Sequence, residues 1–378
     1  MKICFFGTYE NGYPLNSIII KGLKKNDINV VECHEPLWEK YRNKHGNFIK
    51  LFSLLKFSFG IMLSYLKLCF KYSSKCKNVD VIVVGYIGQL DIIFLKLLTL
   101  FKKKKPKIVF IPLVSLYDTA IIDRGLSKKS NFFAKVLFFI DKYSFKIADL
   151  VLFDTNEHIN YICDTFKLNK DKFKRIWVGA DEDIFYPIYN DKKNNKNIFK
   201  ILFIGKYIPL HGIKYIIKAA KLLENEEDIR FKIIGSGQLN EEITKLRKEL
   251  TIRNIDFVDW IDYNKLVNEI NNTDVILGIF GGTQKSLRVI PNKVFQSVAC
   301  KKAVITGDTI AIRELFKDKE NIYLCENRNP ESLKNAILTL KNDEKLKEKI
   351  AYNSYNIFQR ELNTRAIGKE ILKIINEL

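Results

Sequence analysis

Two segments place basic residues directly after a short apolar strand, where parallel sheets bind anionic ligands. In residues 200–212 (KILFIGKYIPLHG) the apolar run stops at Gly205, Lys206 follows at once, and a helix is expected to begin at the end of the segment. In residues 290–305 (IPNKVFQSVACKKAVI), Lys293 lies in a turn ahead of a helix and a further apolar strand. Backbone N–H groups and the helix dipole favour negative charge at such positions. The two segments therefore predict one crevice that binds a phosphate-bearing ligand.

The length and charge of the chain limit the classes of protein to which it can belong. At 378 residues, 47% of them apolar, it exceeds the size at which a single core usually stops growing, so we expect two domains. Its 63 Lys and Arg residues against 43 Asp and Glu give a net charge of +20. This excess indicates either anionic partners, such as nucleotide phosphates and anionic lipid, or a solvated lysine-rich surface. No nucleic-acid partner is expected, because no RNA- or DNA-binding motif accompanies the charge.

The cysteines and the N-terminus favour a cytoplasmic location. The seven cysteines are scattered and form no CxxC pair, so neither a disulfide framework nor a metal site is expected. The first residues, MKICFFG, run straight into a predicted strand without the long apolar run and cleavage site of a signal peptide.

The longest apolar segment, residues 48–72, is interrupted by lysines. Only residues 57–66 are uncharged, which is too short to span a bilayer. Its aromatic, leucine and lysine residues suit either an ordinary packed helix or a helix that contacts a membrane surface, peripherally at the inner face.

Short runs rich in Val, Ile and Phe alternate with helical segments, which is typical of parallel α/β sheets. Strands are predicted at 2–8, 29–34, 79–86, 107–113, 150–155 and 175–178, then at 200–205, 230–235, 255–260, 274–280, 303–306 and 321–325. Asn156 is expected to cap the helix after the fifth strand, and the polar segment 191–197 is predicted to be a linker. We predict two Rossmann-like domains whose parallel sheets face each other across a cleft, over 1–190 and 198–360. A C-terminal helix, 361–378, is expected to pack back on the first domain.

Five segments in the right order resemble motifs of GT-B glycosyltransferases of the large family-4 group, which are retaining enzymes that use sugar nucleotides. The segments are ADLVLFDT (148–155) followed by His158, WVGADEDIFYP (177–187), GKYIPLHG (205–212), FKIIGSGQL (231–239) and PNKVFQSVACKKAVI (291–305). The resemblance covers essentially the whole chain and is strongest from Arg175 onward.

The resemblance implies that basic side chains and helix N-termini, without a metal or other cofactor, stabilise the charge that grows on a leaving diphosphate. Lys206 and Lys293 would then be catalytic and bind the diphosphate; the alternative is that both are ordinary solvated lysines. His211 stands where the motif usually has lysine. A neutral imidazole can donate one hydrogen bond to phosphate, or it can cap the helix beside Gly212.

The same segments imply further contacts with the donor. Arg288 and Gln296 occupy the positions of two family glutamates, the second of which contacts the ribose. Arg288 can clamp phosphate and Gln296 can hydrogen-bond the ribose hydroxyls, while Asn292 belongs to the same turn. Gly281 and Gly282 follow a strand and either present backbone N–H groups to the donor or form a plain turn.

The first domain offers weaker candidates. Gly7 and Gly12, in the loop GTYENGYP, allow the backbone to approach the donor diphosphate. Many relatives carry a histidine after the fourth strand; this chain has none there, and Asp118 is our choice for a catalytic or acceptor contact. His158 is expected to be structural. The triplet at 181–183 (DED) looks like a metal motif but lies in the interdomain segment, so no metal is assigned to it.

These expectations describe an enzyme that moves a sugar from a nucleotide-sugar donor to a glycan or lipid-linked acceptor with retention. The N-terminal domain would hold the acceptor and the C-terminal domain the donor. Two alternatives share the architecture. A sugar-nucleotide epimerase should carry more acidic and histidine residues around the cleft, and this chain has four histidines in all. A sugar-nucleotide-binding protein without turnover would account for the departures at His211, Arg288 and Gln296.

Overall fold

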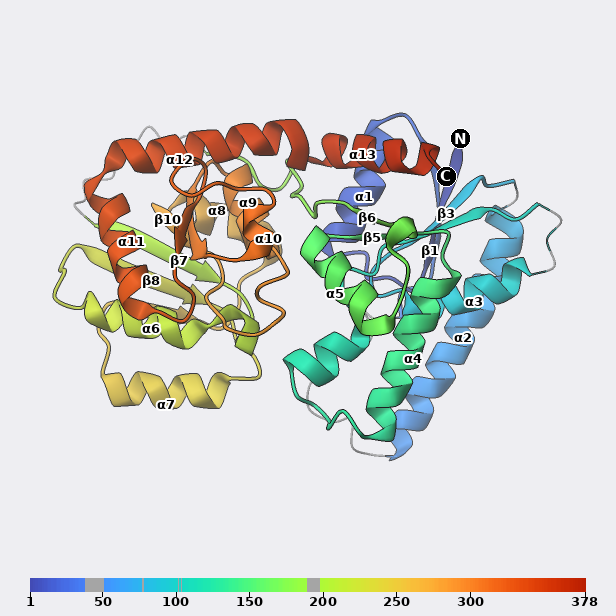
Figure 1. Cartoon of the computed structure of the whole chain (residues 1–378), viewed down its shortest axis with the longest axis horizontal. Coiled ribbons are helices and arrows are strands. Elements are labelled where there is room, and N and C mark those ends of the chain that lie inside the picture. The colour runs from blue at the N-terminus through green and yellow to red at the C-terminus, as the bar shows by residue number, and fades with distance from the viewer. Residues whose placement is uncertain (38–50, 77, 101, 103, 189–197) are drawn as a thin grey trace. The chain divides into compact units, whose positions relative to one another are not determined.

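The computed structural model describes residues 1–37, 51–76, 78–100, 102, 104–188 and 198–378, without the side chains of residues 51–58. The chain forms two compact units, which Figure 1 shows by residue colour. Unit 1 comprises residues 1–177 and 364–378, and unit 2 comprises residues 178–363. The predicted linker at 191–197 lies outside the described residues.

Unit 1 is built on a six-stranded sheet in the order β2-β1-β3-β4-β5-β6, in which all the pairings are parallel. Its strands are β1 (Lys2–Gly7), β2 (Asn29–His34), β3 (Val81–Val84), β4 (Lys107–Phe110), β5 (Leu150–Phe153) and β6 (Phe173–Arg175). Its helices are α1 (Pro14–Lys25), α2 (Leu51–Lys75), α3 (Gln89–Thr99), α4 (Phe132–Ile147), α5 (Asn156–Phe166) and α13 (Thr364–Asn376).

The direction of the crossovers assigns the helices of unit 1 to two faces of the sheet. From β2 to β6 each connection steps the same way across the sheet, so right-handed crossovers place α2, α3, α4 and α5 on one face. One apolar core accordingly joins Leu68 of α2, Leu95 of α3 and Phe145 of α4 to the strands. The connection from β1 to β2 steps the other way, which puts α1 on the opposite face.

The C-terminal helix α13 packs against α1 (Figure 1). Two glycines allow the helices to approach closely. A Cβ atom on Gly22 would lie 2.3 Å from the carbonyl oxygen of Thr364, and one on Gly368 would lie 2.2 Å from the backbone of Gly22. Asn26 extends the contact by donating a hydrogen bond to the carbonyl oxygen of Arg365 at 2.9 Å. Helix α13 thus completes the packing of unit 1 over α1.

Unit 2 is built on a second parallel sheet, in the order β12-β11-β10-β7-β8-β9. Its strands are β7 (Phe199–Ile204), β8 (Ile229–Ile234), β9 (Ile255–Val258), β10 (Val275–Leu277), β11 (Ala303–Gly307) and β12 (Tyr323–Cys325). Its helices are α6 (Ile213–Leu222), α7 (Asn240–Leu250), α8 (Leu266–Asn271), α9 (Asn292–Ala299), α10 (Ile310–Arg313), α11 (Pro330–Asn342) and α12 (Glu344–Ile357).

The strand order of unit 2 reverses beside β7. From β7 the chain proceeds to β8 and β9 on one side, then returns to place β10 on the other side of β7. Ligands of open parallel sheets bind at such a switch point, outside the carboxyl ends of the two strands. The loops that follow β7 and β10 therefore define where a ligand of unit 2 is expected.

The predicted class, two Rossmann-like units with parallel sheets, is confirmed, with two local corrections. The sixth strand was expected at residues 175–178 but runs over Phe173–Arg175, because Phe173 supplies the buried side chain that pairs beside β5. Asn156 is the first residue of α5 and not its cap. Thr155 is the cap, since its side chain accepts a hydrogen bond from the backbone N–H of His158.

Candidate functional site

The two segments singled out in the sequence meet at the switch point of unit 2. The N–H of Phe280, beyond β10, donates to the carbonyl oxygen of His211, beyond β7, at 3.2 Å. Gly212 has a φ of 65°, and a Cβ atom there would lie 2.5 Å from the backbone nitrogen of Gly281. Only glycine fits this crossing of the two loops, because any side chain would separate them. The loops after β7 and β10, about seventy positions apart in the sequence, are thus in direct contact.

Lys293 projects into this junction from the first turn of α9. Its side chain is 5% exposed, and its ammonium lies 3.6 Å from the centroid of the Phe203 ring and 3.3 Å from the carbonyl oxygen of Gly278, to which it donates. A Cβ atom on Gly205 would lie 2.9 Å from Nζ of Lys293 and 2.8 Å from Cε1 of His211. The missing side chain of Gly205 therefore leaves room at a point that the ammonium and the imidazole both border.

The electrostatics of this junction favour a negatively charged ligand. Burial lowers the pKa of Lys293 well below its usual value. Burial, followed by the neighbouring Lys293 ammonium, also lowers the pKa of His211 well below its usual value. Among the described residues, no carboxylate forms a salt bridge with Lys293. A phosphate group placed here would offset the cost of the buried charge and raise both pKa values.

His211 uses its hydrogen bond differently from the prediction. Its Nδ1 lies 2.5 Å from the carbonyl oxygen of Lys206, so Nδ1–H donates to that oxygen. A neutral imidazole then presents only an acceptor at Nε2, and it must take up a proton before it can donate to phosphate. His211 does not cap α6, which begins after Gly212 without a side-chain cap. The side chain of Lys206 is exposed at the edge of the same loop.

The remaining predicted donor contacts lie around α9. Gln296 is buried, and its Nε2 donates to the hydroxyl of Tyr263 at 3.3 Å. Tyr263 packs edge-on against Phe185, and burial raises its pKa to about 12. Asn292 is the half-buried first residue of α9, and Arg288 is buried in the loop before it. Sequence reasoning missed Tyr263, since its position before α8 resembles no motif.

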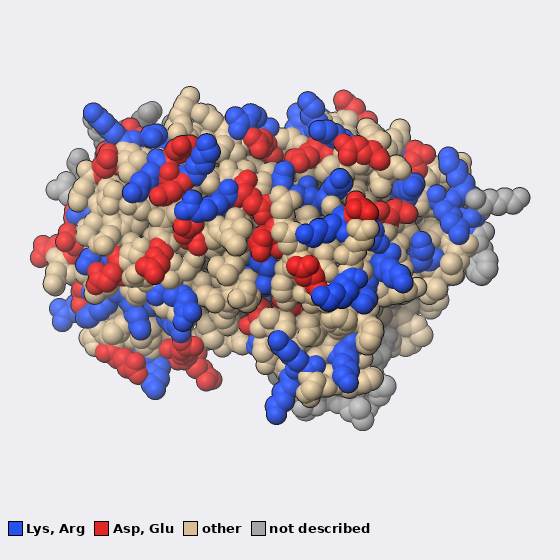
Figure 2. Space-filling model, viewed as in Figure 1, with Lys and Arg blue, Asp and Glu red and all other residues tan. Residues whose placement is uncertain are grey.

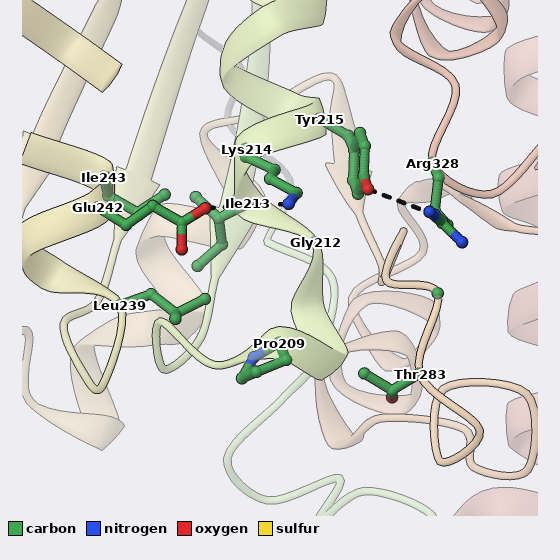
Figure 3. A pocket seen from close by; sticks show the side chains of 11 residues that line it. Pro209, Gly212, Ile213, Lys214, Tyr215, Leu239, Glu242, Ile243, Thr283 and Arg328 are labelled. Atoms are coloured by element: carbon green, nitrogen blue, oxygen red, sulfur yellow. Dashed lines mark hydrogen bonds and ion pairs between the residues drawn. The ribbon is translucent and has the colours of Figure 1, made fainter. Parts of the chain in front are cut away.

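A pocket of about 360 Å³ opens beside the loop junction (Figure 3). Gly282 of the predicted site lines it together with Pro209, Gly212, Thr283 and Arg328. On one side Arg328 donates to the hydroxyl of Tyr215 at 3.4 Å, and Figure 3 shows these two side chains approaching each other. On the other side Lys214 pairs with Glu242 of α7 at 3.9 Å. The pocket thus combines cationic groups with an apolar floor that includes Leu239 and Ile243.

In unit 1 a buried carboxylate holds the loop that follows β1. Asp91 of α3 accepts hydrogen bonds from the N–H of Thr8 at 2.8 Å, from its hydroxyl, and from the hydroxyl of Tyr65 at 2.8 Å. A Cβ atom on Gly7 would lie 2.3 Å from Oδ2 of Asp91. Burial raises the pKa of Asp91 to about 6. Gly7 is therefore required for this clamp, whereas Gly12 lies in the exposed turn before α1.

A second buried carboxylate organises the segment that contains Asp118. Asp141 of α4 accepts from the hydroxyl of Ser115 at 2.7 Å and from the N–H groups of Leu116 and Tyr117. Burial raises its pKa to about 6. Asp118 begins the π-helical turn Asp118–Asp123, and its side chain is fully buried. The sequence signal for Asp91 and Asp141 was their position as the single acids of helices whose other charged residues are lysines.

Two further sequence candidates have local structural contacts. The ring of His158 is fully buried, and its Nδ1 lies 2.6 Å from Oδ1 of Asp154. Asp181 accepts from the N–H of Asp183 within a turn in unit 2. Among the described residues, no group of three or more His, Cys, Asp and Glu side chains is arranged to hold a metal ion. No helix in the described part of the chain has the length and hydrophobicity needed to cross a bilayer.

Comparisons with known proteins identify the class of protein that has this fold and this arrangement of loops. Residues 188–357, which span most of unit 2, match the model of the family "Glycosyl transferases group 1". An uncharacterized glycosyltransferase of Methanocaldococcus jannaschii is 27% identical over 297 residues, which are 76% of this chain and 72% of that protein. A Campylobacter jejuni N-acetylgalactosaminyltransferase, named for a diphospho-undecaprenol acceptor, is 24% identical over 66% of this chain and 64% of its own length.

Solved structures agree on the fold. The sucrose-phosphate synthase of Thermosynechococcus elongatus superposes with a TM-score of 0.74 at 12% identity, covering 99% of this chain and 98% of that one. The Anabaena protein HepE, solved in complex with UDP, gives a TM-score of 0.71 at 14% identity and full coverage of both chains. The molecule has the GT-B fold. Unit 2 thus matches the group 1 glycosyltransferase family, and the relatives named above are glycosyltransferases.

Proposed function

We propose that this glycosyltransferase transfers a sugar from a nucleoside diphosphate sugar to a glycan or lipid-linked acceptor, with retention of the anomeric configuration. The observation that carries the proposal is the buried ammonium of Lys293, which lies at the switch point beside Gly205 and His211 without a carboxylate partner among the described residues. Such a charge is costly unless a ligand anion neutralises it.

The chemistry of transfer accounts for this arrangement. Breaking the bond between the anomeric carbon and the diphosphate leaves negative charge on the phosphate oxygens. A preorganised cation in a site that excludes water stabilises this charge more strongly than it would in solvent. Lys293, protonated His211 and the N-terminus of α9 would act together on the diphosphate, with Lys206 at the exposed edge. No metal ion is required in this proposal.

The relatives support the classes of donor and acceptor. HepE has been solved with UDP and with UDP-glucose, which supports a uridine diphosphate sugar as the donor to test first. The Campylobacter jejuni relatives are named for acceptors on diphospho-undecaprenol, which supports a lipid-linked acceptor. An acceptor of that kind would bring the enzyme to the inner face of the cytoplasmic membrane.

A thermal-shift screen with UDP, GDP, ADP and CMP at equal concentrations tests the donor site. We expect one nucleotide to raise the melting temperature of the wild type, with no such shift in Lys293→Met. The matched control, Lys345→Ala, removes an exposed lysine of α12 and should behave as the wild type. Stabilisation that persists in Lys293→Met would place the nucleotide elsewhere and contradict the proposal.

Two measurements test the mechanism once a donor is known. The anomeric configuration of the product, read from its NMR coupling constant, should equal that of the donor. Activity should persist after treatment with a chelator. An inverted product would overturn the retaining mechanism, and loss of activity that added metal restores would overturn metal independence.

A further inference from the structure

The layer of helices α2, α3 and α4 on unit 1 exposes an unusual amount of apolar surface. Among the described residues, thirteen of the twenty large apolar side chains that are exposed lie between residues 59 and 143. Soluble proteins seldom expose contiguous apolar patches of this kind unless the patch binds something. We define the α2–α4 face as the exposed apolar residues of these three helices.

The solvent side of α2 is mostly apolar from Phe59 to Phe70, with Lys67 exposed beside the apolar residues. The exposed residues recur at helical spacing and so form one stripe. They are Phe59, Met62, Leu63, Leu66 and Phe70, the last of which is 77% exposed. The opposite side of the helix, which includes Leu68 and Tyr72, packs into the core of unit 1. The inner side of α2 is therefore buried in the core of unit 1, and the outer apolar stripe does not contribute to the packing of this unit.

Helix α4 repeats the pattern with aromatic residues. Phe132, which is 82% exposed, Phe139 and Tyr143 are exposed at helical spacing. Lys135 and Lys146, also exposed, lie beside them on the same side of the helix. Aromatic residues with flanking lysines suit an interface between hydrocarbon and water, because lysine stems extend along apolar surface while the ammonium reaches the phosphate level.

Helix α3 joins the two stripes into one surface. Its Phe94 contacts Tyr65 of α2 at a ring-centroid distance of 4.7 Å, and its other side packs on α4. Because all three helices cover the same face of the sheet, their outer sides point the same way. Leu97, exposed on α3, continues the apolar surface between α2 and α4.

Basic residues predominate around this face. Helix α2 contains no acidic residue, and the single acids of α3 and α4, Asp91 and Asp141, are buried. At the carboxyl end of α4, a pocket of about 510 Å³ is lined by Lys142, Lys146, Lys167, Leu168, Asn169, Asp171 and Lys172. In the view of Figure 2, the lower part of unit 1 shows blue and tan surface without red.

From this geometry we propose that the α2–α4 face docks on the surface of a bilayer that contains anionic lipid. The apolar stripes enter the headgroup boundary and the lysines contact lipid phosphates. A second copy of this chain would not be a good occupant, because its own α2–α4 face is equally basic and like charges would oppose each other across the contact. The proposal concerns unit 1 alone and does not depend on the identity of the donor.

Vesicle flotation tests the proposal on the full chain. We expect the wild type to float with vesicles of equal parts phosphatidylcholine and phosphatidylglycerol, to do so less as salt is added, and not to float with phosphatidylcholine alone. Phe70→Ser combined with Phe139→Ser, and separately Lys135→Ala combined with Lys146→Ala, should each weaken binding by about tenfold or more. All four positions are exposed or lie on the solvent side, so the variants should fold, which circular dichroism would check.

The controls make the same changes on unit 2. Trp260→Ser removes a 72% exposed aromatic residue, and Lys345→Ala with Lys349→Ala removes two exposed lysines. Each should float as the wild type does. Absence of binding to anionic vesicles, or equal losses in the unit 2 controls, would overturn the proposal. A dimer in light scattering that the Phe70 and Phe139 changes dissociate would also overturn it, in favour of self-association. The nucleotide-dependent thermal shift should be the same in all these variants, so failure here leaves the donor site untouched.

Discussion

The ammonium of Lys293 lies 3.6 Å from the centroid of the Phe203 ring. Phe203 is the next-to-last residue of β7, and Lys293 is the second residue of α9. An aromatic face attracts a cation without neutralising its charge, unlike a carboxylate. The contact therefore holds the ammonium in position beside Gly205 and leaves its charge for a ligand.

Replacing Lys293 by methionine should separate binding from stability. A side chain of similar length without charge removes the buried ammonium, so we expect a free energy of unfolding that is unchanged or higher by about 1–3 kcal/mol. Binding of the nucleoside diphosphate should weaken by at least about tenfold, because a charge-assisted hydrogen bond to phosphate is lost. Urea unfolding and calorimetric titration measure the two quantities. A variant that is destabilised and still binds would show that Lys293 is a structural residue.

The stability of the ligand-free protein should depend on His211 below about pH 6.5. Because its folded pKa is depressed from the ordinary value of 6.5, the unfolded chain binds the proton more readily than the folded one. The stabilisation of the folded protein by the neutral ring is thus fully present above pH 6.5. It is lost as the pH falls toward the pKa of His211 in the folded protein. Compared with His211→Gln, the wild type should lose melting temperature progressively over this interval.

The comparison with the variant isolates His211 from other titrating groups. Asp91 and Asp141, whose pKa values are raised to about 6, act in the opposite direction, because their stability contribution is lost as the pH rises from 3.8 toward 6. Both carboxylates are present in each protein, so their effects cancel in the difference. Identical pH profiles for the wild type and His211→Gln would contradict the prediction.

Substituting Gly7 by alanine should destabilise unit 1 by about 2–4 kcal/mol. The new Cβ atom would meet Oδ2 of Asp91, which cannot move without breaking its bonds to Thr8 and Tyr65. The matched control is Gly125→Ala, where φ is 62° but no atom lies within 4 Å of the added carbon. Backbone strain alone should then cost about 1–2 kcal/mol. If urea unfolding gives the same loss of unfolding free energy for both variants, the contact with Asp91 does not contribute to the destabilisation.

Gln296→Glu should strengthen binding of a ribose-bearing donor several-fold. The resemblance places an acid at this position, and a carboxylate accepts hydroxyl hydrogen bonds about twice as strongly as an amide. The structure can accommodate it, because the Tyr263 hydroxyl, which now accepts from Gln296, can rotate its proton and donate instead. Calorimetry with the nucleotide found in the thermal-shift screen measures the change. Weaker binding would mean that the side chain at 296 does not face the ribose.

The sequence predicted the fold well and the site only in outline. Alternating short apolar strands and amphipathic helices define a parallel sheet because both patterns are local, so the fold class is confirmed and the strand positions agree except at the sixth strand. The junction of Gly212 with Gly281 also has a local cause, since both glycines lie in loops that follow strands. The predicted roles of Lys206, Lys293, Asp118 and the donor-binding residues remain predictions.

Other parts of the site depend on distant pairing that no local pattern reveals. The clamp of Asp91 on Thr8 joins residues 83 positions apart. The Nδ1 proton of His211 is committed to the Lys206 carbonyl oxygen by the path of the loop, which spacing alone does not determine. Tyr263 contacts Gln296 from 33 positions away. Residues of this kind hold the predicted residues in place, and the structure was needed to find them.

The pairing of α13 with α1 has a consequence for biosynthesis. Residues 1–177 leave the ribosome long before residues 364–378 are made, yet both belong to unit 1. Domains generally fold as units during translation. The surface of α1 around Gly22 therefore stays exposed to solvent while unit 2 is synthesised and folds. Unit 2, whose residues are contiguous, has no such delay. During this interval the nascent chain is a natural client for chaperones, and a ribosome stalled before residue 364 would leave unit 1 incomplete.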